Sequence, residues 1–436
     1  MKPWKMLITT AMAVGCFVLL SFTSSNEGKR PRKSTFRSIP KGCVFRTLMG
    51  EESSAPSAGY VTDERVNSTI TRGLDWIGHA QNTDGGWGAG SHYRQDIMDP
   101  HAVSSDPATT SMVGMALLRT GSDFTHGRYS AELRKALTYV LGAVETSDDG
   151  NPTITNQSGT QIQIKLGQNI DVVMAAQFLT NAGDHLAASD PLSNRVKSAL
   201  QRCVNKIQRA QQSNGSMSGS GWAGVLQSSF ATTALEAAQA HGYQVDAKTL
   251  DQARAFQKAN YDSKTGAVNT ELGAGVLLYS VSGSTRASAK EARRAAEAID
   301  EAKRIGKLSA EAPATAENLE KIGFDKDDAM KLSSAYGVYQ AAKQRAQQMD
   351  VMDGFGSNGG EEFLSYLQTG ESMIIGKDNA WKQWYDNISG RLLRIQNDDG
   401  SWSGHHCITS PVFCTATCLL ILSVNNDVDK LIDLGK

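Results

Sequence analysis

The strongest constraint on the fold is a short pattern that occurs near both ends of the chain. Residues 81–87 read Gln-Asn-Thr-Asp-Gly-Gly-Trp, and residues 396–402 read Gln-Asn-Asp-Asp-Gly-Ser-Trp. Before the first copy, Ile70, Leu74 and Ile77 are spaced three and four residues apart, which is typical of a helix with one buried stripe. After each copy come a short loop and a second stretch rich in small residues. The repeated unit is therefore predicted to be a helical hairpin.

The glycine of each turn is expected to end the first helix of its hairpin. Gly85 and Gly400 suit this role because glycine adopts the left-handed conformation of a helix C-cap without a Cβ penalty. Trp87 and Trp402 are then expected to pack against the hairpin. Trp222, which follows a glycine in the middle of the chain, is predicted to occupy the same position in a third copy.

Weaker copies of the hairpin lie between these two. Their first helices fall near residues 139–141, 196–207 and 256–257, their second helices near 170–179, 229–238 and 271–279, and a degenerate copy ends at 361–370. The chain therefore contains about six hairpins. Stacked helical repeats must cap their ends or close on themselves. The small residues of the second helices favour closure, because they let an inner ring of helices pack close to an axis.

The Gln-x-x-Asp-Gly-x-Trp turn followed by a Thr/Ala-rich helix resembles a known repeat. It is similar to the prenyltransferase and squalene-oxidase repeat of terpenoid cyclases, protein prenyltransferase β subunits and thioester-containing complement domains. The resemblance covers roughly residues 65–425 and implies an all-α fold, the α/α toroid, with an inner ring of helices inside an outer one. Because one fold hosts many chemistries, the resemblance does not name a reaction.

The N-terminus has the features of an export signal. Lys2 and Lys5 precede an apolar run over residues 6–22, which small residues follow. We expect residues 1–25 to be a signal peptide and the mature chain to be periplasmic or secreted. The run is also nearly long enough for a membrane helix, so an uncleaved N-terminal membrane anchor is the alternative.

Composition divides the rest of the chain. Residues 26–64 are basic and then rich in Ser and Pro, as in a flexible linker. The toroid is expected over 65–425, followed by a C-terminal tail, 426–436. Within the toroid, Ala, Lys, Glu and Arg dominate residues 284–350, which are predicted to be a helical insertion, either a solvated one or a docking arm. The chain has 44 basic and 45 acidic residues, a balance that excludes nucleic acid as a partner.

Functional side chains are expected at one end of the ring, where the loops after the turns meet the N-termini of the second helices. The polar residues at those positions are His92, His101, Asp106, Thr109, Thr110, Asp171, Glu271, Glu361, Glu362, His405, His406, Cys407 and Cys414. The candidates for catalysis are Asp106, Asp171, Glu271, His405 and Cys407. Asp171 and Glu271 could equally do no more than complement the dipoles of the helices that they begin. Arg94 is the obvious cation in the same region.

Closure of the ring would bring the loops of the first and last hairpins together. Imidazole, thiolate and carboxylate groups in one cluster suit Zn²⁺, and the candidate ligands are His92, Asp106, His405, His406, Cys407 and Cys414. Protein prenyltransferases, which the repeat resembles, bind zinc through Asp, Cys and His near this end of the ring, but their Asp-x-Cys pairing does not occur here. In an exported protein, Cys407 and Cys414 could instead form a disulfide.

Catalytic signatures of the families that share the repeat are missing from the predicted ring. The one Asp-x-Asp-Asp of the sequence, residues 325–328, lies in the predicted insertion, and the Cys-Gly-Glu-Gln thioester does not occur. The predicted inner helices also contain few aromatic residues to stabilise a carbocation, mainly Phe178, Tyr279, Phe363 and Tyr366. Terpene cyclisation is therefore disfavoured.

Two functional hypotheses remain. The first is an exported toroid that binds a lipid, a glycan or a protein partner at the mouth of the ring without turnover. The second is an enzyme, either a prenyltransferase-like transferase or a polysaccharide lyase or hydrolase, that uses the His, Cys and acidic cluster. A bound metal would distinguish them.

Overall fold

The structure is a computed structural model that describes residues 62–435. All of these residues belong to the larger of two compact units of the chain, residues 40–436. The predicted signal peptide and the predicted linker up to residue 61 lie outside the described residues. The described part is built from helices and turns, and its only β-structure is a few isolated bridges.

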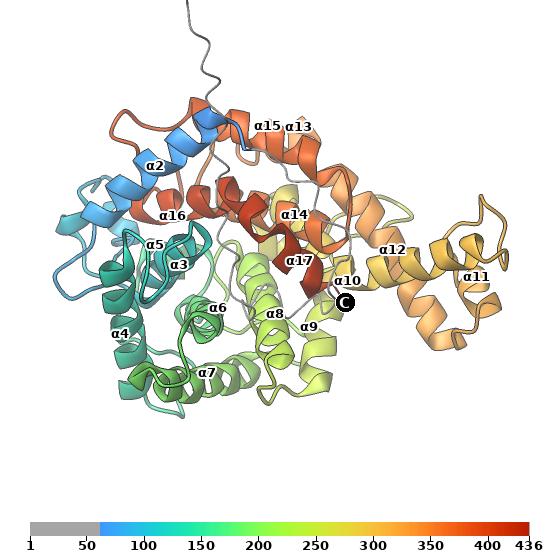
Figure 1. Cartoon of the computed structure of the whole chain (residues 1–436), viewed down its shortest axis with the longest axis horizontal. Coiled ribbons are helices and arrows are strands. Elements are labelled where there is room, and N and C mark those ends of the chain that lie inside the picture. Colours follow the sequence, from blue (N-terminus) through green and yellow to red (C-terminus); the bar gives the residue numbers. More distant parts are fainter. Residues whose placement is uncertain (1–61, 436) are drawn as a thin grey trace, which may run out of the picture. The chain divides into compact units, whose positions relative to one another are not determined.

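Within this part, six helices form a closed inner ring (Figure 1). They are α3 (Pro107–Arg119), α6 (Ile170–His185), α8 (Gly224–Ala240), α10 (Leu277–Arg304), α14 (Gly360–Ile375) and α16 (Pro411–Leu422). Each helix contacts the next in this order, and α16 contacts α3. The ring therefore closes on itself.

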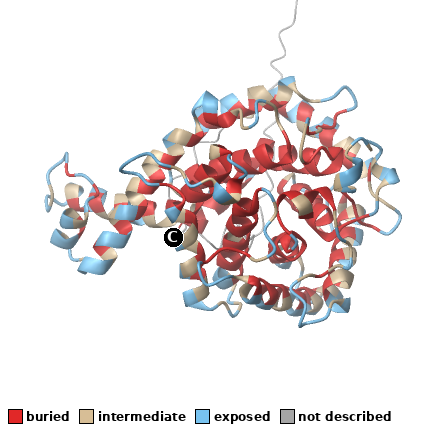
Figure 2. Ribbon diagram, turned by 180° about the vertical axis from the view of Figure 1, so that it is seen from behind, coloured by how far each residue is buried: buried red, intermediate tan, exposed pale blue. Residues whose placement is uncertain are grey.

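A second set of helices surrounds the ring. They are α2 (Glu64–His79), α4 (Ser130–Thr146), α7 (Pro191–Ala210), α9 (Ala247–Ala259), α12 (Lys326–Ala346) and α15 (Trp381–Arg394). Each precedes one inner helix in the sequence, and each packs on the ring. Figure 2 shows the buried residues concentrated in the inner helices, whereas the outer helices keep an exposed face. The predicted α/α toroid of about six hairpins is confirmed.

A glutamine side chain links successive outer helices at the repeated turn. In the first hairpin, Gln81 Nε2 donates to the carbonyl of Gly85 in its own turn (2.9 Å) and to the carbonyl of Glu132 on the next outer helix, α4 (2.9 Å). One side chain therefore fixes the shape of the turn and its position against the neighbouring hairpin.

The same link recurs in the third and sixth hairpins. Gln211 Nε2 donates to the carbonyl of Thr249 on α9 (3.0 Å), and Gln396 Nε2 donates to the carbonyl of Thr69 on α2 (3.0 Å). The second of these bonds joins the last hairpin to the first. The repeated turn thus also closes the ring.

The outer helices end before the turn, which corrects the expectation that glycine ends them. α2 ends at His79 and α15 ends at Arg394. Gly85 and Gly400 lie further along, inside the turn, with φ angles of +87° and +94°. A Cβ atom on Gly85 would lie 2.8 Å from the Lys135 side chain of α4. Glycine is needed there for the positive φ and for the close approach of the next hairpin.

Trp87 and Trp402 are fully buried at equivalent turns. Trp87 Nε1 donates to the carbonyl of Ile77, and Trp402 Nε1 donates to the carbonyl of Leu392, each at 2.9 Å. Each indole therefore ties its turn back to the outer helix that precedes it.

Trp222 does not occupy this position, contrary to the prediction, because its side chain is 62% exposed. Met217 takes the place of the indole in the third hairpin. The backbone N–H of Met217 donates to Ser228 Oγ (3.0 Å), as that of Trp87 donates to Thr110 Oγ1 (2.9 Å). Met217 is 3% exposed, so an apolar side chain closes this turn too.

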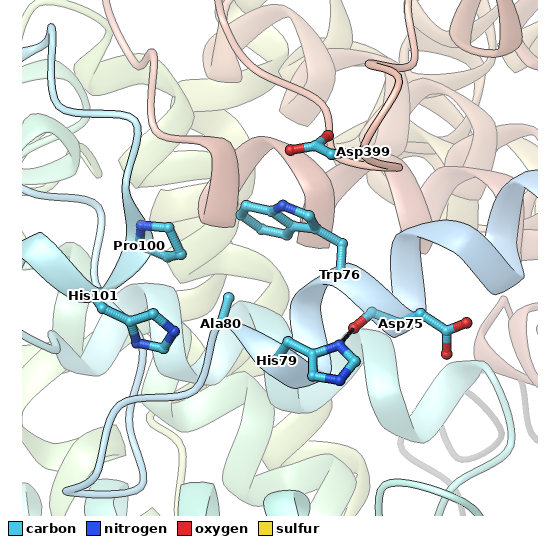
Figure 3. Close-up of a pocket in the computed structure, with 7 residues that line it drawn as sticks. All are labelled: Asp75, Trp76, His79, Ala80, Pro100, His101 and Asp399. Atoms are coloured by element: carbon cyan, nitrogen blue, oxygen red, sulfur yellow. Dashed lines mark hydrogen bonds between the residues drawn. The ribbon is translucent and has the colours of Figure 1, made fainter.

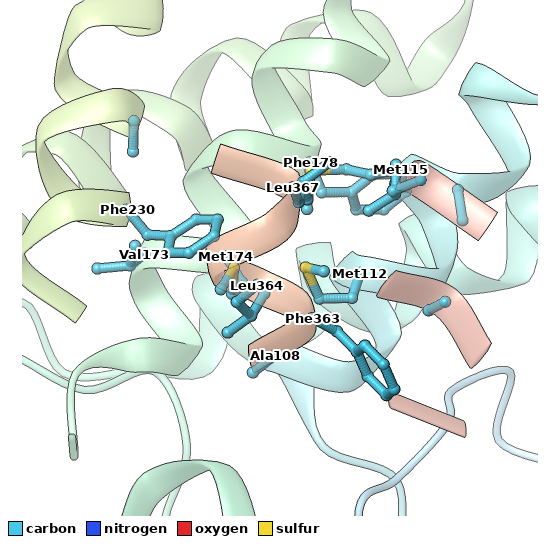
Figure 4. Close-up of a cluster of buried hydrophobic side chains, with 14 of the residues drawn as sticks. Ala108, Met112, Met115, Val173, Met174, Phe178, Phe230, Phe363, Leu364 and Leu367 are labelled. Atoms are coloured by element: carbon cyan, nitrogen blue, oxygen red, sulfur yellow. The ribbon is translucent and has the colours of Figure 1, made fainter. Parts of the chain in front are cut away.

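Apolar side chains from opposite parts of the ring meet in one buried cluster (Figure 4). They include Met112 and Met115 of α3, Met174 and Phe178 of α6, Phe230 of α8, and Phe363, Leu364 and Leu367 of α14. A Cβ atom on Gly114 would lie 2.4 Å from the Phe178 ring, which shows how closely the inner helices approach. The interior of the ring is a packed apolar core.

α10 and α12 extend away from the ring as an arm (Figure 1), with α11 (Ala316–Lys321) between them. A small apolar cluster, which includes Ile299, Leu319 and Leu332, holds the arm together. The predicted insertion, residues 284–350, is larger than this arm. The first half of α10 belongs to the inner ring and the end of α12 packs on it, next to the short helix α13 (Met349–Met352).

The C-terminal residues form part of the toroid instead of a separate tail. α17 (Val428–Leu434) packs on α14, and Leu431 and Leu434 are buried. No single helix within residues 62–435 is long and apolar enough to cross a membrane. One bent pair, α16 with residues 424–434, has sufficient length and apolar composition.

Replacement of the buried Trp402 and of the exposed Trp222 should affect stability differently. Trp402→Ala should lower the free energy of unfolding by about 3–5 kcal/mol, because it removes a buried ring and its hydrogen bond. Trp222→Ala should change it by less than about 1 kcal/mol, because the side chain is exposed. Urea unfolding followed by circular dichroism measures both. Equal losses would contradict the assignment of Met217 as the equivalent of Trp402.

Candidate functional site

A short helix, α5 (Gln161–Lys165), lies over one end of the ring, which we call the mouth. The mouth is formed by the N-termini of the inner helices. Gln161 Oε1 accepts from the backbone N–H of Thr409 (2.7 Å), just before α16, and Gln163 Nε2 donates to Asp171 Oδ2 at the start of α6 (2.7 Å). Thr160 and Gln163 form a capping box that begins α5. These bonds hold α5 across the mouth.

Loops from three other hairpins surround α5. The loop that contains η1 (His92–Arg94) joins the start of α5, where the backbone N–H of His92 donates to the carbonyl of Gly159 (3.0 Å). The loop before α8 joins its end, where the backbone N–H of Ala223 donates to the carbonyl of Lys165 (2.7 Å). The loop before α16 is bound through Thr409. Loops far apart in the sequence thus form one surface.

Asp106 and Asp171 form a buried carboxyl pair where α3 and α6 begin. Asp106 accepts from the backbone N–H groups of Thr109 (2.7 Å) and Ala89 (2.8 Å), and Asp171 accepts from that of Ala108 (3.1 Å). Burial raises the pKa of both carboxyls, and the charge of Asp106 helps to raise the pKa of Asp171 to about 7. Both groups are enclosed by protein and hold the helix starts together.

Glu361 and Glu362 form a second buried pair at the start of α14. Glu362 Oε1 accepts from the hydroxyl of Tyr279 (2.7 Å), and its Oε2 accepts from the backbone N–H of Gly359 (2.8 Å). Glu361 Oε2 accepts from the backbone N–H of Ile408 (3.3 Å). Burial, followed by the charge of Glu362, raises the pKa of Glu361 to about 7. Glu361 therefore holds its proton to a higher pH than an exposed carboxyl does.

Lys165 is the buried cation of the mouth, a role that sequence reasoning missed. It is 4% exposed, and its ammonium lies 3.9 Å from the centre of the Trp222 ring. No carboxylate oxygen within residues 62–435 lies within 4.0 Å of this ammonium. Arg94, the cation expected here, is instead exposed and pairs with Asp96 (3.0 Å).

His405, His406 and Cys407 lie together in the loop before α16. Ser357 Oγ lies 3.3 Å from Nδ1 of His405 and 3.0 Å from Nδ1 of His406. His406 Nε2 faces Glu362 Oε1 at 3.8 Å, and the carboxylate raises the pKa of His406. No group in the described part of the chain hydrogen-bonds to this buried nitrogen.

Cys407 and Cys414 are free thiols, so the disulfide considered from the sequence is not formed. Cys414 is fully buried, and its Sγ donates to the carbonyl of Ile408 (3.5 Å). Cys407 is half-buried with a φ of +61°. Burial raises its pKa to about 12, so the thiol stays protonated at neutral pH.

The candidate zinc ligands do not form a coordination group. No three His, Cys, Asp or Glu side chains of residues 62–435 are arranged to hold one metal ion. His92 Nδ1 bonds instead to Gln95 Nε2 (2.8 Å), and Asp106 caps α3. Glu271 is exposed on η3 (Glu271–Gly273), and no hydrogen bond or ion pair joins it to the residues around α5. The zinc interpretation therefore has no geometric support.

Three exposed aromatic side chains lie on loops of the mouth, and we call them the aromatic rim. They are Tyr93 (82% exposed), Trp222 (62%) and Phe355 (50%). Tyr93 lies beside Gly159, Trp222 covers Lys165, and Phe355 packs its ring on that of His406, with the centres 5.3 Å apart. Large apolar groups gathered on a surface are typical of binding sites.

A separate pocket of about 270 Å³ lies on the outer side of the seam between the first and last hairpins (Figure 3). Its lining residues are Asp75, Trp76, His79, Ala80, Pro100, His101 and Asp399. The candidate residue His101, on η2 (Pro100–Ala102), lies here. No residue of the aromatic rim or of α5 lines this pocket, so it is a different site from the mouth.

Comparison with solved structures finds a type II terpene cyclase, MstE from Scytonema. Its apo form is 12% identical over 84% of this chain and 100% of the cyclase chain, with a TM-score of 0.42. A variant of MstE bound to its product, merosterolic acid A, is 12% identical over 84% of this chain and 98% of the other, also with a TM-score of 0.42. No protein-family profile matches the sequence, and no curated protein matches it.

The described part of the protein is an α/α toroid. This follows from the closed ring of inner helices, each preceded by an outer helix. The sequence located the helix starts of the mouth, including Asp106, Asp171 and Glu361. It missed Lys165 and the aromatic rim of the toroid, although the Thr-x-x-Gln capping box at Thr160 would have revealed α5.

The buried carboxyl of Glu361 predicts a pH-dependent stability. A carboxyl with a raised pKa in the folded state binds its proton more tightly there than in the unfolded chain, so its favourable contribution is complete below the unfolded pKa of 4.5 and is lost as the pH rises to about 7. Glu361→Gln mimics the protonated form. The variant should therefore gain stability relative to the wild type, by about 1–3 kcal/mol between pH 5 and pH 8.

Urea unfolding at several pH values measures this difference, with Glu320→Gln on the exposed face of α11 as the matched control. For the control, the difference in unfolding free energy between variant and wild type should not change with pH. If the difference for Glu361→Gln does not change with pH either, Glu361 is not protonated in the folded protein.

Proposed function

We propose that this toroid binds a ligand at its mouth, on the surface formed by α5 and the aromatic rim. The observation that carries the proposal is the exposure of Tyr93, Trp222 and Phe355 on three separate loops of the mouth, with Trp222 over the buried ammonium of Lys165. Aromatic side chains provide a large contact area at a small cost in conformational entropy, which makes them effective binding residues.

Hydrogen bonds between the loops favour binding by a preformed surface. Thr409 Oγ1 donates to the carbonyl of Gln95 (2.8 Å), which joins the loops of Tyr93 and His406. The backbone N–H of His405 donates to the carbonyl of Asn358 (2.8 Å), which joins the loop of Phe355. A surface held in this way loses little conformational freedom when a ligand binds.

Enzymatic turnover is the second candidate function, and Glu361 favours it. A carboxyl with a pKa of about 7 is suited to general acid–base catalysis. Glu361 is 2% exposed, however, and lies beneath the loop that carries Cys407. Turnover would therefore require that loop or α5 to move. Binding at the exposed rim needs no such movement, so we place it first.

The proposed binding predicts a loss of affinity on removal of the rim. A panel of lipids, glycans and peptides is screened by the thermal shift that each gives the mature protein. For any ligand found, Trp222→Ala and Tyr93→Ala should weaken binding by about tenfold or more. Met330→Ala removes an equally exposed side chain from α12 (55% exposed) and should have no effect. If Met330→Ala weakens binding as much as the rim substitutions do, the ligand does not bind specifically at the aromatic rim.

We also propose that the mature chain acts outside the cytoplasm, on the basis of Lys2, Lys5 and the apolar run over residues 6–22. Fractionation of cells that express a C-terminally tagged protein should find it in the exported fraction. N-terminal sequencing should then begin after residue 22, or at Met1 on a membrane-bound protein if the segment is an anchor. A soluble cytoplasmic protein that retains Met1 would reject the proposal.

A further inference from the structure

We infer that the pocket between the first and last hairpins, which we call the seam pocket, binds an organic cation. The ammonium or guanidinium group of the ligand lies against the indole of Trp76 and the carboxylate of Asp399 (Figure 3). This site is separate from the mouth, so the inference goes beyond the proposed function. It rests on an open cavity, an aromatic ring, and a carboxylate that pairs with no cation of the described residues.

The seam pocket is small and open to solvent. His79, His101 and Asp399 are exposed, and Trp76 is half-buried. The volume of about 270 Å³ is close to the lower end of the range for ligand pockets, about 300 Å³. Because these side chains line one cavity of this size, a small ligand contacts several of them at once, and its entry needs no movement of the chain.

Asp399 provides the acceptor for the cation. Its Oδ1 accepts from the backbone N–H of Ser401 (2.9 Å) and from the hydroxyl of Ser401 (2.7 Å), which holds the carboxylate in the turn. No cation of residues 62–435 lies within 4.0 Å of this carboxylate, and none of these residues donates to its Oδ2. A fixed carboxylate with one free oxygen is suited to a charge-assisted hydrogen bond from an ammonium or a guanidinium.

Trp76 provides the aromatic face. It packs on the core from α2 but stays half-buried, and no group in the described part of the chain accepts from its indole N–H. In the view of Figure 3 its ring lies between the carboxylate of Asp399 and the imidazole rings of His79 and His101. A cation within about 6 Å of an aromatic ring is attracted by the ring electrons, and tryptophan gives the strongest contact of this kind.

The same two positions in the first hairpin are joined by protein. Asp84 lies where the repeat places Asp399, and Tyr139 lies where it places Trp76, seven residues after the carbonyl that binds the turn glutamine. There the Ser105 hydroxyl donates to Asp84 Oδ1 (2.7 Å), and the Ser105 carbonyl accepts from the Tyr139 hydroxyl (2.9 Å). No residue within 62–435 links Asp399 to Trp76 in this way. A ligand in the seam pocket supplies the link that Ser105 makes in the first hairpin.

The charges of the lining favour a cation over an anion. Two carboxylates, Asp75 and Asp399, line the cavity, and neither lysine nor arginine does. Asp75 is paired with Arg128 (2.6 Å) and accepts from the Tyr129 hydroxyl (2.7 Å), so it adds no net charge. With both imidazoles neutral, the lining carries the single negative charge of Asp399.

Arg72, one turn before Trp76 on α2, does not neutralise Asp399. Its Nη2 donates to the carbonyls of Asn397 (3.0 Å) and Asp398 (2.8 Å), so the guanidinium is bound to the backbone of the turn. The exposed carboxylate of Asp398, which forms no ion pair with a residue of 62–435, offsets its charge. The field in the seam pocket is therefore set by Asp399 and attracts a positively charged ligand.

His79 and His101 do not make the seam pocket a metal site. No three His, Cys, Asp or Glu side chains in the described part of the chain are arranged to hold one metal ion. His79 Nδ1 lies 2.7 Å from the carbonyl oxygen of Asp75, and the Asp75 carboxylate is bound to Arg128. The two imidazoles therefore form walls of the cavity beside the carboxylate that binds the cation.

The experiment is an NMR titration of the mature protein with four probes that share a butyl chain. They are butylammonium, butylguanidinium, the neutral butanol and the anionic butyrate. Saturation transfer to each probe gives its affinity, and the indole N–H signal of Trp76, assigned by its loss in Trp76→Leu, reports where the probe binds. At least one cation should shift this signal and bind about tenfold or more tightly than butanol, with an affinity that falls as salt is added.

A peptide probe distinguishes the source of the cation. A capped pentapeptide with one lysine among glycines presents the same ammonium on a protein backbone. If it binds more tightly than butylammonium, the pocket receives a side chain of a partner protein. If it binds more weakly, the ligand is a free amine or guanidine.

Substitutions test the two assigned residues. Asp399→Asn keeps an oxygen for the bonds from Ser401 but removes the charge, so it should weaken cation binding by about tenfold or more and leave butanol within about twofold. Trp76→Leu keeps an apolar side chain and should weaken cation binding by about threefold or more. Asp84→Asn is the matched control, because Asp84 holds the equivalent place in the first turn, where it accepts from the backbone N–H of Gly86 (3.0 Å), and does not line the pocket.

Three outcomes would overturn the inference. Butanol or butyrate that binds as tightly as the cations would remove the cation site, and so would an equal effect of Asp399→Asn and Asp84→Asn. Cation binding that is lost from Trp222→Ala but kept in Asp399→Asn would place the cation at the mouth instead. If Asp399→Asn does not fold, Trp76→Leu and the Trp76 signal of the wild type decide. None of these results bears on the ligand of the mouth, whose binding depends on Trp222 and not on Asp399.

Discussion

The structure depends on the closure of its ring. α3, α14 and α16 are buried along their whole length, so neither end of an open array could face water without exposing an apolar helix. The bond from Gln396 Nε2 to the carbonyl of Thr69 joins the last hairpin to the first, and Arg72 adds bonds to the carbonyls of Asn397 and Asp398 on the same seam. The contact is the same one that joins neighbouring hairpins elsewhere in the ring. The ring therefore closes through the same glutamine contact that joins neighbouring hairpins, here between the last hairpin and the first.

The chemistry of the mouth is a consequence of this closure. The N-termini of the inner helices meet there, and some of them are capped by a carboxylate or a hydroxyl, as Asp106 caps α3 and Ser410 caps α16. α5 and the loops around it enclose the mouth, where Asp171 and Glu361 are almost completely buried. A carboxyl that loses water holds its proton more tightly, which is why Asp171 and Glu361 have a pKa near 7. Lys165, at the end of α5, is buried beneath Trp222.

The interior and the mouth of the ring serve different purposes. Met112, Phe178 and Phe363 belong to the continuous apolar core inside the ring, so the interior stabilises the fold. The polar and aromatic groups that suit a ligand lie on the loops over α5, outside that core. The one Asp-x-Asp-Asp of the sequence, residues 325–328, lies away from the mouth, where Asp325 caps α12 on the arm. The binding site that we propose lies on these loops, as in many folds that host several activities.

The sequence by itself determined the repeat, the number of hairpins, the closure and the buried roles of Trp87 and Trp402. These follow from local spacing, because a helical stripe and a turn motif are written in adjacent residues. The same spacing, from Gln211 through Gly215 to Met217, identifies the true equivalent of the turn tryptophan. Only the tertiary structure decided that Trp222 is exposed over Lys165, that Cys407 and Cys414 are free, and that the candidate zinc ligands bind other partners. Loops have no periodicity, and the partner of a loop side chain depends on which distant loop the closed ring places beside it.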